Sequence, residues 1–166
     1  MSTTLARPKP TLRERNQLRY ASRPGDPSVI AAGFIGDTRG MTDPQLEELE
    51  KFLKQVKPPV LFLHHRMRPG ADVQANIIAR KLEIMTVGHP LVGHGRQASD
   101  LALDYRQQER FDPARTRDML KLVKYVICAP FARYESRKDQ TWRIARECFN
   151  QGKPVVLIFP DGDTNQ

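Results

Sequence analysis

The sequence contains few cysteines and no long apolar run. Cys128 and Cys148 are the only cysteines among 166 residues, and they form no C-x-x-C pair, so a cysteine-based metal or redox site has no support. No apolar stretch approaches the length of a membrane span, and the N-terminus has no signal-peptide core. We therefore expect a soluble, cytoplasmic globular protein with two buried free thiols.

Two well-known phosphate-binding patterns are also missing. The glycines of GFIGDTRGMTDPQ, residues 33–45, match neither G-x-G-x-x-G nor a P-loop, because no G-K-[ST] follows. Glycines still let a backbone approach an anion closely, and the N-terminus of the helix expected next attracts negative charge. The stretch is therefore either a phosphate cradle, formed by Thr42 and the amides of Gly40 and Met41, or only a tight turn.

Positive charge is concentrated at the N-terminus. Six basic and two acidic residues give residues 1–27 a charge of +4, half of the net charge of +8, and this stretch also contains four prolines. The composition predicts an extended basic arm, 1–27, before a domain spanning 28–166. The arm either binds nucleic acid, anionic lipid or an acidic partner, or it is simply solvated; its acidic residues and prolines fit a transit peptide less well.

Strand and helix patterns alternate from Ser28 onward. Apolar runs predict strands at 28–34, 60–65, 84–90, 125–130 and 154–160, and helices are expected over 42–56, 70–82, 112–123 and 141–150. Residues 93–112 are interpreted as a long loop. The alternation predicts an α/β fold, a doubly wound, mostly parallel five-stranded sheet with helices on both faces. The strand from Ser28 should be central, between the strands ending at His64 and Ala129.

Ligands of such sheets bind at the carboxyl ends of the strands. Glycine, histidine and aspartate are frequent after the predicted strands of this chain. The four histidines, His64, His65, His89 and His94, have no helical spacing and no paired carboxylates, so hydrogen bonding to a ligand or a loop role is favoured over a metal site. Asp72 is expected to cap its own helix. Trp142 either stacks on a base or packs in the core.

The ordered motifs resemble the SLOG superfamily. The motifs are GFIGDTRGMT, HH…GAD…A…IA, GHP, ICAP and TW…AR…GKPVVLIFPDG, which together span about 28–163. The superfamily includes Lonely Guy-type proteins and the Rossmann domain of DNA-processing protein A, and the likeness is to the small branch related to the YspA and YpsA proteins of bacteria and phages. It implies a Rossmann-like fold that binds a nucleotide or a nucleotide-derived ligand. Some members hydrolyse the N-glycosidic bond of nucleoside monophosphates, whereas others only sense a ligand.

Several residues depart from the pattern of these relatives. Relatives have His-His-Gly-Asp-Cys where this chain has HHRMR, residues 64–68, and Asp37 places a carboxylate where a phosphate would prefer a hydroxyl. The glutamate of the hydrolase motif is absent, because Arg143 and Ile144 stand at the matching positions. A nearby carboxylate normally stabilises the oxocarbenium-like transition state of such hydrolysis. The remaining candidates are Asp37, Asp72, Glu135, Asp139 and Asp161.

The sequence therefore favours a divergent SLOG domain that binds a nucleotide-type ligand without robust catalysis, cofactor or metal. An N-glycosidase is the first alternative. The second is a structural protein with a degenerate pocket that docks through the arm. The oligomeric state, a homo-oligomer included, stays open. The candidate ligand-binding residues are Gly33, Phe34, Gly36, Asp37, Thr38, Gly40, Met41, Thr42, His64, His65, Gly70, Ala71, Asp72, His89, Pro130, Thr141, Trp142 and Asp161.

Overall fold

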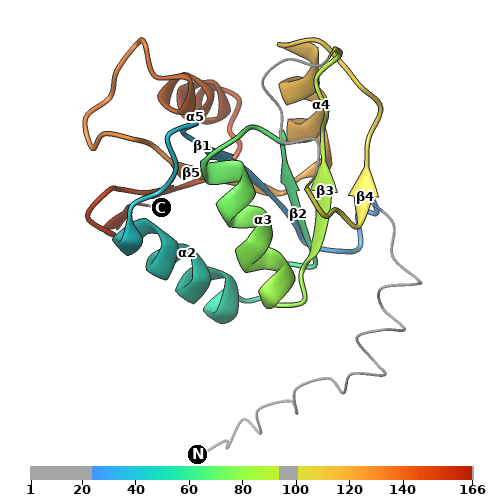
Figure 1. The fold of residues 1–166 in the computed structure, drawn as a ribbon, viewed down its shortest axis with the longest axis horizontal. Helices are drawn as coiled ribbons and strands as arrows, with labels where there is room; N and C mark the ends of the chain where they lie inside the picture. The colour runs from blue at the N-terminus through green and yellow to red at the C-terminus, as the bar shows by residue number, and fades with distance from the viewer. Residues whose placement is uncertain (1–23, 94–100, 166) are drawn as a thin grey trace, which may run out of the picture.

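The computed structural model describes residues 24–93 and 101–165 as alternating strands and helices (Figure 1). Most of the predicted basic arm and His94 therefore lie outside the described residues. The strands are β1 (Ala31–Gly36), β2 (Phe62–His65), β3 (Met85–Gly88), β4 (Tyr105–Arg106), β5 (Tyr125–Ala129), β6 (Val155–Ile158) and β7 (Thr164–Asn165). The helices are α2 (Asp43–Gln55), α3 (Ala71–Lys81), α4 (Ala114–Leu122) and α5 (Gln140–Asn150).

The sheet has the order β4-β3-β2-β1-β5-β6-β7, with β1 at its centre. All neighbouring strands from β4 to β6 are parallel. In β1, Gly33 is paired with His64 of β2 on one side and Val126 of β5 on the other. The predicted central strand and its two neighbours are thereby confirmed, and the carboxyl ends of the parallel strands lie at one edge of the sheet.

The sheet contains seven strands rather than the predicted five. The two additional strands, β4 and β7, have two residues each and lie at opposite edges. β4 belongs to the segment interpreted as a loop, and β7 pairs antiparallel with β6 in the segment interpreted as a tail. The sequence could not reveal them, because the side chains of both are exposed or only partly buried and two residues are too few to show a periodic pattern.

Two apolar layers hold the helices on the two faces of the sheet. Leu49 and Leu53 of α2 pack in one layer with Ala75 and Ile78 of α3, and Figure 1 shows these helices side by side. The other layer contains residues of α4 and α5, among them Met119 and Cys148. Both cysteines are buried and free, as predicted. The fold is therefore a three-layer, doubly wound α/β domain.

The predicted capping box at the start of α2 also contains the residue that connects this helix to the edge of the sheet. The backbone N–H of Gln45 donates to the Thr42 hydroxyl at 3.3 Å, and the Thr42 N–H donates to Gln45 Oε1 at 3.0 Å. The Gln45 side-chain amide then donates to the carbonyls of Pro130 and Ile158, both at 2.9 Å. The N-terminus of α2 is thus tied to the ends of β5 and β6.

Candidate functional site

The backbone amides of the loop after β1 donate hydrogen bonds to acceptors within the protein. The Gly40 N–H donates to the Asp37 carbonyl at 3.1 Å, and the Met41 N–H donates to Gln74 Oε1 at 2.6 Å. The Thr42 N–H is bonded to Gln45, as described above. The two amides that the sequence offered to a phosphate, those of Gly40 and Met41, and the Thr42 N–H therefore already have protein acceptors. An anion would have to displace Gln74 to reach the Met41 amide.

Asp37 faces Arg39 and stays away from the N-terminus of α2. Its carboxylate accepts from Arg39 Nε at 2.8 Å and from Arg39 Nη2 at 3.1 Å, and the hydrogen bond from the Arg39 side chain is the main reason why the pKa of Asp37 is lowered. The Arg39 guanidinium also lies over the ring of Phe131, 3.3 Å from its centroid. Asp37 therefore does not occupy the position of a ligand at α2.

Gly36 and Gly70 allow the loop after β1 to touch the start of α3. A Cβ atom on Gly36 would lie 2.3 Å from the Cβ of Ala71, and one on Gly70 would lie 2.2 Å from the Thr38 carbonyl oxygen. The Ala71 N–H donates to the Asp37 carbonyl at 3.0 Å. In the structure these glycines serve a close contact between two backbone segments, and their role in ligand binding stays a prediction.

The turn between β2 and α3 is organised by Asp72. One carboxylate oxygen, Oδ2, accepts the backbone N–H groups of Arg66 and Arg68, both at 3.1 Å. The expectation that Asp72 caps its own helix is wrong, because the carboxylate bonds the turn before the helix. Gly70 is the N-cap residue and provides no side-chain hydrogen bond. The other oxygen, Oδ1, is buried without a hydrogen-bond partner.

The side chain of Arg66 is fully buried and only partly satisfied. Its Nη1 lies 3.4 Å from the Thr116 hydroxyl oxygen, whereas its Nε and Nη2 have no hydrogen-bond partner. Burial lowers the pKa of Arg66 to about 10; the charge of Asp72 opposes this shift, whereas the guanidinium groups of Arg68 and Arg115 act in the same direction as burial. The group is nevertheless charged at neutral pH, so a buried cation lies at this edge of the sheet with two unused donors.

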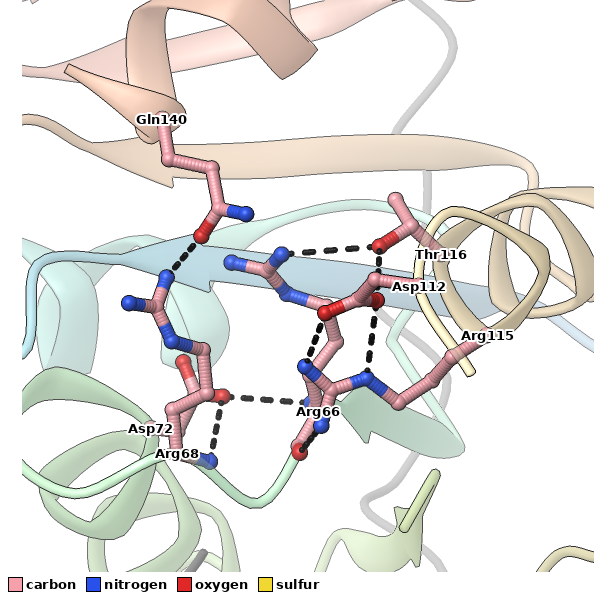
Figure 2. Close-up of polar contacts among 7 residues, drawn as sticks. All are labelled: Arg66, Arg68, Asp72, Asp112, Arg115, Thr116 and Gln140. Carbon is pink, nitrogen blue, oxygen red and sulfur yellow. Dashed lines mark hydrogen bonds and ion pairs between the residues drawn. The ribbon is translucent and has the colours of Figure 1, made fainter. Parts of the chain in front are cut away.

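Arg115 and Asp112 form the wall beside Arg66. Asp112 receives Arg115 Nε at 3.1 Å and Arg115 Nη2 at 2.8 Å, while Arg115 Nη1 donates to the Arg66 carbonyl at 2.9 Å. Figure 2 shows the Arg115 side chain reaching from α4 to the backbone carbonyl of Arg66, which directly follows β2. Because Arg115 already uses the Asp112 carboxylate in a two-pronged ion pair, that carboxylate is engaged away from Arg66.

Arg68 completes the cluster on the side of α5. Its Nη1 donates to Oε1 of Gln140, the first residue of that helix (Figure 2). We call Arg66, Arg68, Asp72, Asp112, Arg115, Thr116 and Gln140 the arginine cluster. Three guanidinium groups face two carboxylates in this cluster, and among the described residues neither Arg66 nor Arg68 forms an ion pair. The cluster therefore carries excess positive charge.

A cavity of about 340 Å³ adjoins the arginine cluster between α4 and α5. Thr116 and Gln140, the acceptors for Arg66 and Arg68, both contribute to its wall. The remaining lining residues are Asp112, Pro113, Arg117, Arg143, Ile144 and Glu147. The sequence did not predict this site. The one available signal was the pair of arginines that stands where relatives have Gly and Cys in the HHRMR stretch.

The histidines at the end of β2 and after β3 are buried and neutral. His64 Nδ1 and His89 Nε2 are 2.9 Å apart, and burial lowers the pKa of His64 to about 3 and that of His89 to about 4. His65 receives the Met67 N–H at Nδ1, so its Nε2 donates to Asn76 Oδ1 at 2.9 Å. Within residues 24–93 and 101–165, no group of three His, Cys, Asp or Glu residues is placed to hold a metal ion.

The other candidates lie in the core or in surface ion pairs. Phe34 is fully buried, and Trp142 packs near Phe159, with its Nε1 donating to the Ala132 carbonyl at 3.0 Å. Thr141 is buried, with its N–H bonded to Asp139. Asp161 pairs with Arg133. Each of these residues is therefore packed, hydrogen-bonded or paired within the protein. A role in ligand binding stays a prediction for each of them.

Comparisons with known proteins show the type of fold. No family model matches the chain, and no curated protein matches it. The molybdenum cofactor binding protein of the phototrophic bacterium Rippkaea orientalis is similar in structure, with a TM-score of 0.58 and 20% identity over 79% of this chain and 77% of that one. The structural-genomics target TM1055 has a TM-score of 0.55 and 15% identity, covering 76% of this chain and 72% of that one.

At these identities the likeness shows the fold alone. Together with the parallel sheet, it makes the described domain a Rossmann-like α/β domain. No helix in the described part of the chain combines the length and the apolar character needed to cross a membrane.

Proposed function

We propose that this chain is a divergent SLOG domain, related to the small YspA and YpsA branch, that binds a nucleotide or a nucleotide-derived ligand at the carboxyl edge of its sheet. The sequence motifs and the Rossmann-like fold support this proposal. A structural neighbour described as a molybdenum cofactor binding protein is consistent with a small-molecule ligand. The single observation that carries the proposal is the buried guanidinium of Arg66, whose Nε and Nη2 have no acceptor.

A buried cation with unused donors is costly for a folded chain. An unsatisfied buried donor costs about 1–3 kcal/mol, and more when the group is charged. An anionic ligand would supply both the missing acceptors and the missing negative charge. Phosphate oxygens suit this role well, because a guanidinium group can donate two parallel hydrogen bonds to them. The phosphate end of a nucleotide is therefore the part that we assign to the arginine cluster.

The test is calorimetric titration of the full chain with AMP, ADP-ribose and adenosine. We expect at least one phosphate-bearing ligand to bind, with an affinity that falls as the salt concentration rises, whereas adenosine should bind far more weakly. Mass spectrometry of the denatured protein would also identify a nucleotide that copurifies. Equal binding of adenosine and AMP, or no binding of any of the three, would contradict the proposal.

We expect no appreciable release of free base from nucleoside monophosphates. The four candidate carboxylates other than Asp72 are already engaged: Asp37 pairs with Arg39, Glu135 with Arg146 and Asp161 with Arg133, and Asp139 caps α5. Chromatography of the reaction mixture measures the release. Steady release that Asp37→Asn or Glu135→Gln abolishes would support the N-glycosidase alternative instead.

The basic N-terminal arm offers a separate prediction about a nucleic-acid partner. Deleting residues 2–26 removes six positive and two negative charges. If the arm binds nucleic acid, the deletion should weaken binding and flatten its dependence on salt, because fewer counterions are released. Fluorescence anisotropy with labelled DNA and RNA at several salt concentrations measures both. An unchanged slope would mean that the arm is solvated or contacts another partner.

A further inference from the structure

Gln140 occupies the place where an anionic oxygen would satisfy Arg68. Its Oε1 accepts from Arg68 Nη1, and its side chain is half-buried at the first position of α5. Figure 2 shows the Arg66 guanidinium lying between Gln140 on one side and Thr116 on the other. Arg66 and Arg68, which form no ion pair among the described residues, therefore donate to the neutral oxygens of Thr116 and Gln140.

Neutral acceptors are a weak match for guanidinium groups. A carboxylate or phosphate group can accept two parallel hydrogen bonds from one guanidinium and also brings the opposite charge, whereas an amide or hydroxyl oxygen brings no charge. Thr116 satisfies one N–H group of Arg66 at a long 3.4 Å, and Nε and Nη2 of that side chain stay unpaired. The present partners are thus the ones that an anion would most readily replace.

The residues that line the cavity indicate which side chain must move before a phosphate can reach Arg66. Thr116 and Gln140 line the cavity of about 340 Å³, whereas Arg66 is fully buried and is not among the lining residues. Thr116 is itself buried on α4 and lies 3.4 Å from Asp112. Gln140 has a long side chain at the start of a helix. Rotation of that one side chain would free Arg68 and open a path from the cavity toward Arg66.

The N-terminus of α5 does not supply the main contact. Asp139 places a carboxylate there, and that carboxylate already accepts the Thr141 N–H at 2.8 Å. A second anion at the same helix end would meet its negative charge. The side chains of Arg66 and Arg68, with Arg143 in the cavity wall, are consequently the groups that would hold a phosphate in this chain.

We propose that Gln140 is a displaceable stand-in for a phosphate group, which enters through this cavity, replaces Gln140 on Arg68 and bridges Arg68 to the unpaired donors of Arg66. The proposal rests on the proposed function for the identity of the complete ligand. The contact itself needs only a phosphate. Gln140 then controls access: removal of its side chain should not weaken phosphate binding, whereas a negative charge at this position should weaken it.

The experiment compares Gln140→Glu and Gln140→Ala with the native chain, with Gln55→Glu as the matched control on the opposite face of the sheet. Calorimetry measures the Kd of inorganic phosphate and of AMP at one ionic strength, and thermal melting checks that each variant folds. Gln140→Glu should raise both Kd values about tenfold or more, because its carboxylate would pair with Arg68. Gln140→Ala should leave the Kd values unchanged or lower them, and Gln55→Glu should leave them unchanged.

The outcomes separate this inference from the proposed function. AMP binding that is equal in the native chain, Gln140→Glu and Gln140→Ala would overturn the inference and leave the proposed function intact. Phosphate binding that Gln140→Glu weakens, without any nucleotide binding, would support the inference and overturn the function. Loss of binding in both Gln140 variants would show that Gln140 is a direct ligand, which overturns its role as a stand-in.

Absence of phosphate and AMP binding in the native chain overturns the inference as well. Should Gln140→Glu fail to fold, Arg68→Gln must weaken phosphate binding for the proposal to hold.

Discussion

Replacing Gly70 with alanine is expected to lower the free energy of unfolding by more than about 3 kcal/mol. Gly70 has φ +83° and ψ −119°, a conformation that is essentially restricted to glycine. The new Cβ would lie 2.2 Å from the carbonyl oxygen of Thr38 and 2.5 Å from its carbonyl carbon. These are backbone atoms, which cannot turn aside as the end of a side chain would, so the loop after β1 would have to separate from α3. Chemical denaturation measures the loss.

Gly152→Ala is the matched control for this prediction. Gly152 also has a positive φ, +72°, but a Cβ added there meets nothing within 4 Å. Its replacement should cost only about 1–2 kcal/mol, the usual penalty of a left-handed conformation for a residue with a Cβ. If both substitutions cost the same, a Cβ atom at position 70 is accommodated without a steric cost, and the prediction is wrong. The difference between the two variants therefore isolates the steric effect.

The second large effect is expected for Arg66→Met, which should raise stability while it abolishes phosphate binding. Taking a charge out of water costs several kcal/mol, and Arg66 forms no ion pair among the described residues that would offset this cost. Methionine removes the unpaired Nε and Nη2, whereas the backbone N–H that Asp72 accepts is retained. We expect a gain of about 1–3 kcal/mol in the free energy of unfolding. Denaturant titration and phosphate calorimetry measure the two effects.

Two further variants establish whether Arg66 is retained for binding. Arg137→Met removes a positive charge from an exposed position and should change stability by less than about 0.5 kcal/mol. Arg66→Lys keeps the buried charge with a different donor geometry, so it should weaken phosphate binding without the gain in stability. A clear loss of stability in Arg66→Met would show that the guanidinium is mainly structural, and the argument for a ligand would then fail.

The positions of the central strands were accessible from the sequence because they depend on local patterns, and their order followed from the doubly wound arrangement that the alternation of strands and helices predicts. Short apolar runs marked β1, β2, β3, β5 and β6, and several of these runs are uniformly apolar, as strands buried on both faces should be. The capping box at Thr42 and Gln45 marked the start of α2 for an equally local reason. β4 and β7 were missed, because each consists of two partly or fully exposed residues whose pairing depends on the strand beside it.

At the candidate site, the partners of the polar groups could not be predicted from local patterns in the sequence. The sequence brought the ends of the strands to one edge, since parallel strands share their direction. It could not tell which polar groups there would be satisfied by neighbours. Gln74 takes the Met41 amide from 33 residues away, which no local pattern indicates, and the glycine-rich loop forms a close packing contact with the start of α3.

The sequence by itself determined the doubly wound architecture and the edge of the sheet at which the parallel strands end, because periodicity and turn residues act over a few neighbouring positions. Only the tertiary structure decided which side chains at that edge keep unused bonding capacity. Arg66, Thr116 and Gln140 come from three separate segments, and their contacts exist only after α4 and α5 have packed on the sheet. A hydrogen-bond inventory depends on every neighbour in space, so an unpaired guanidinium could be identified only in the folded chain.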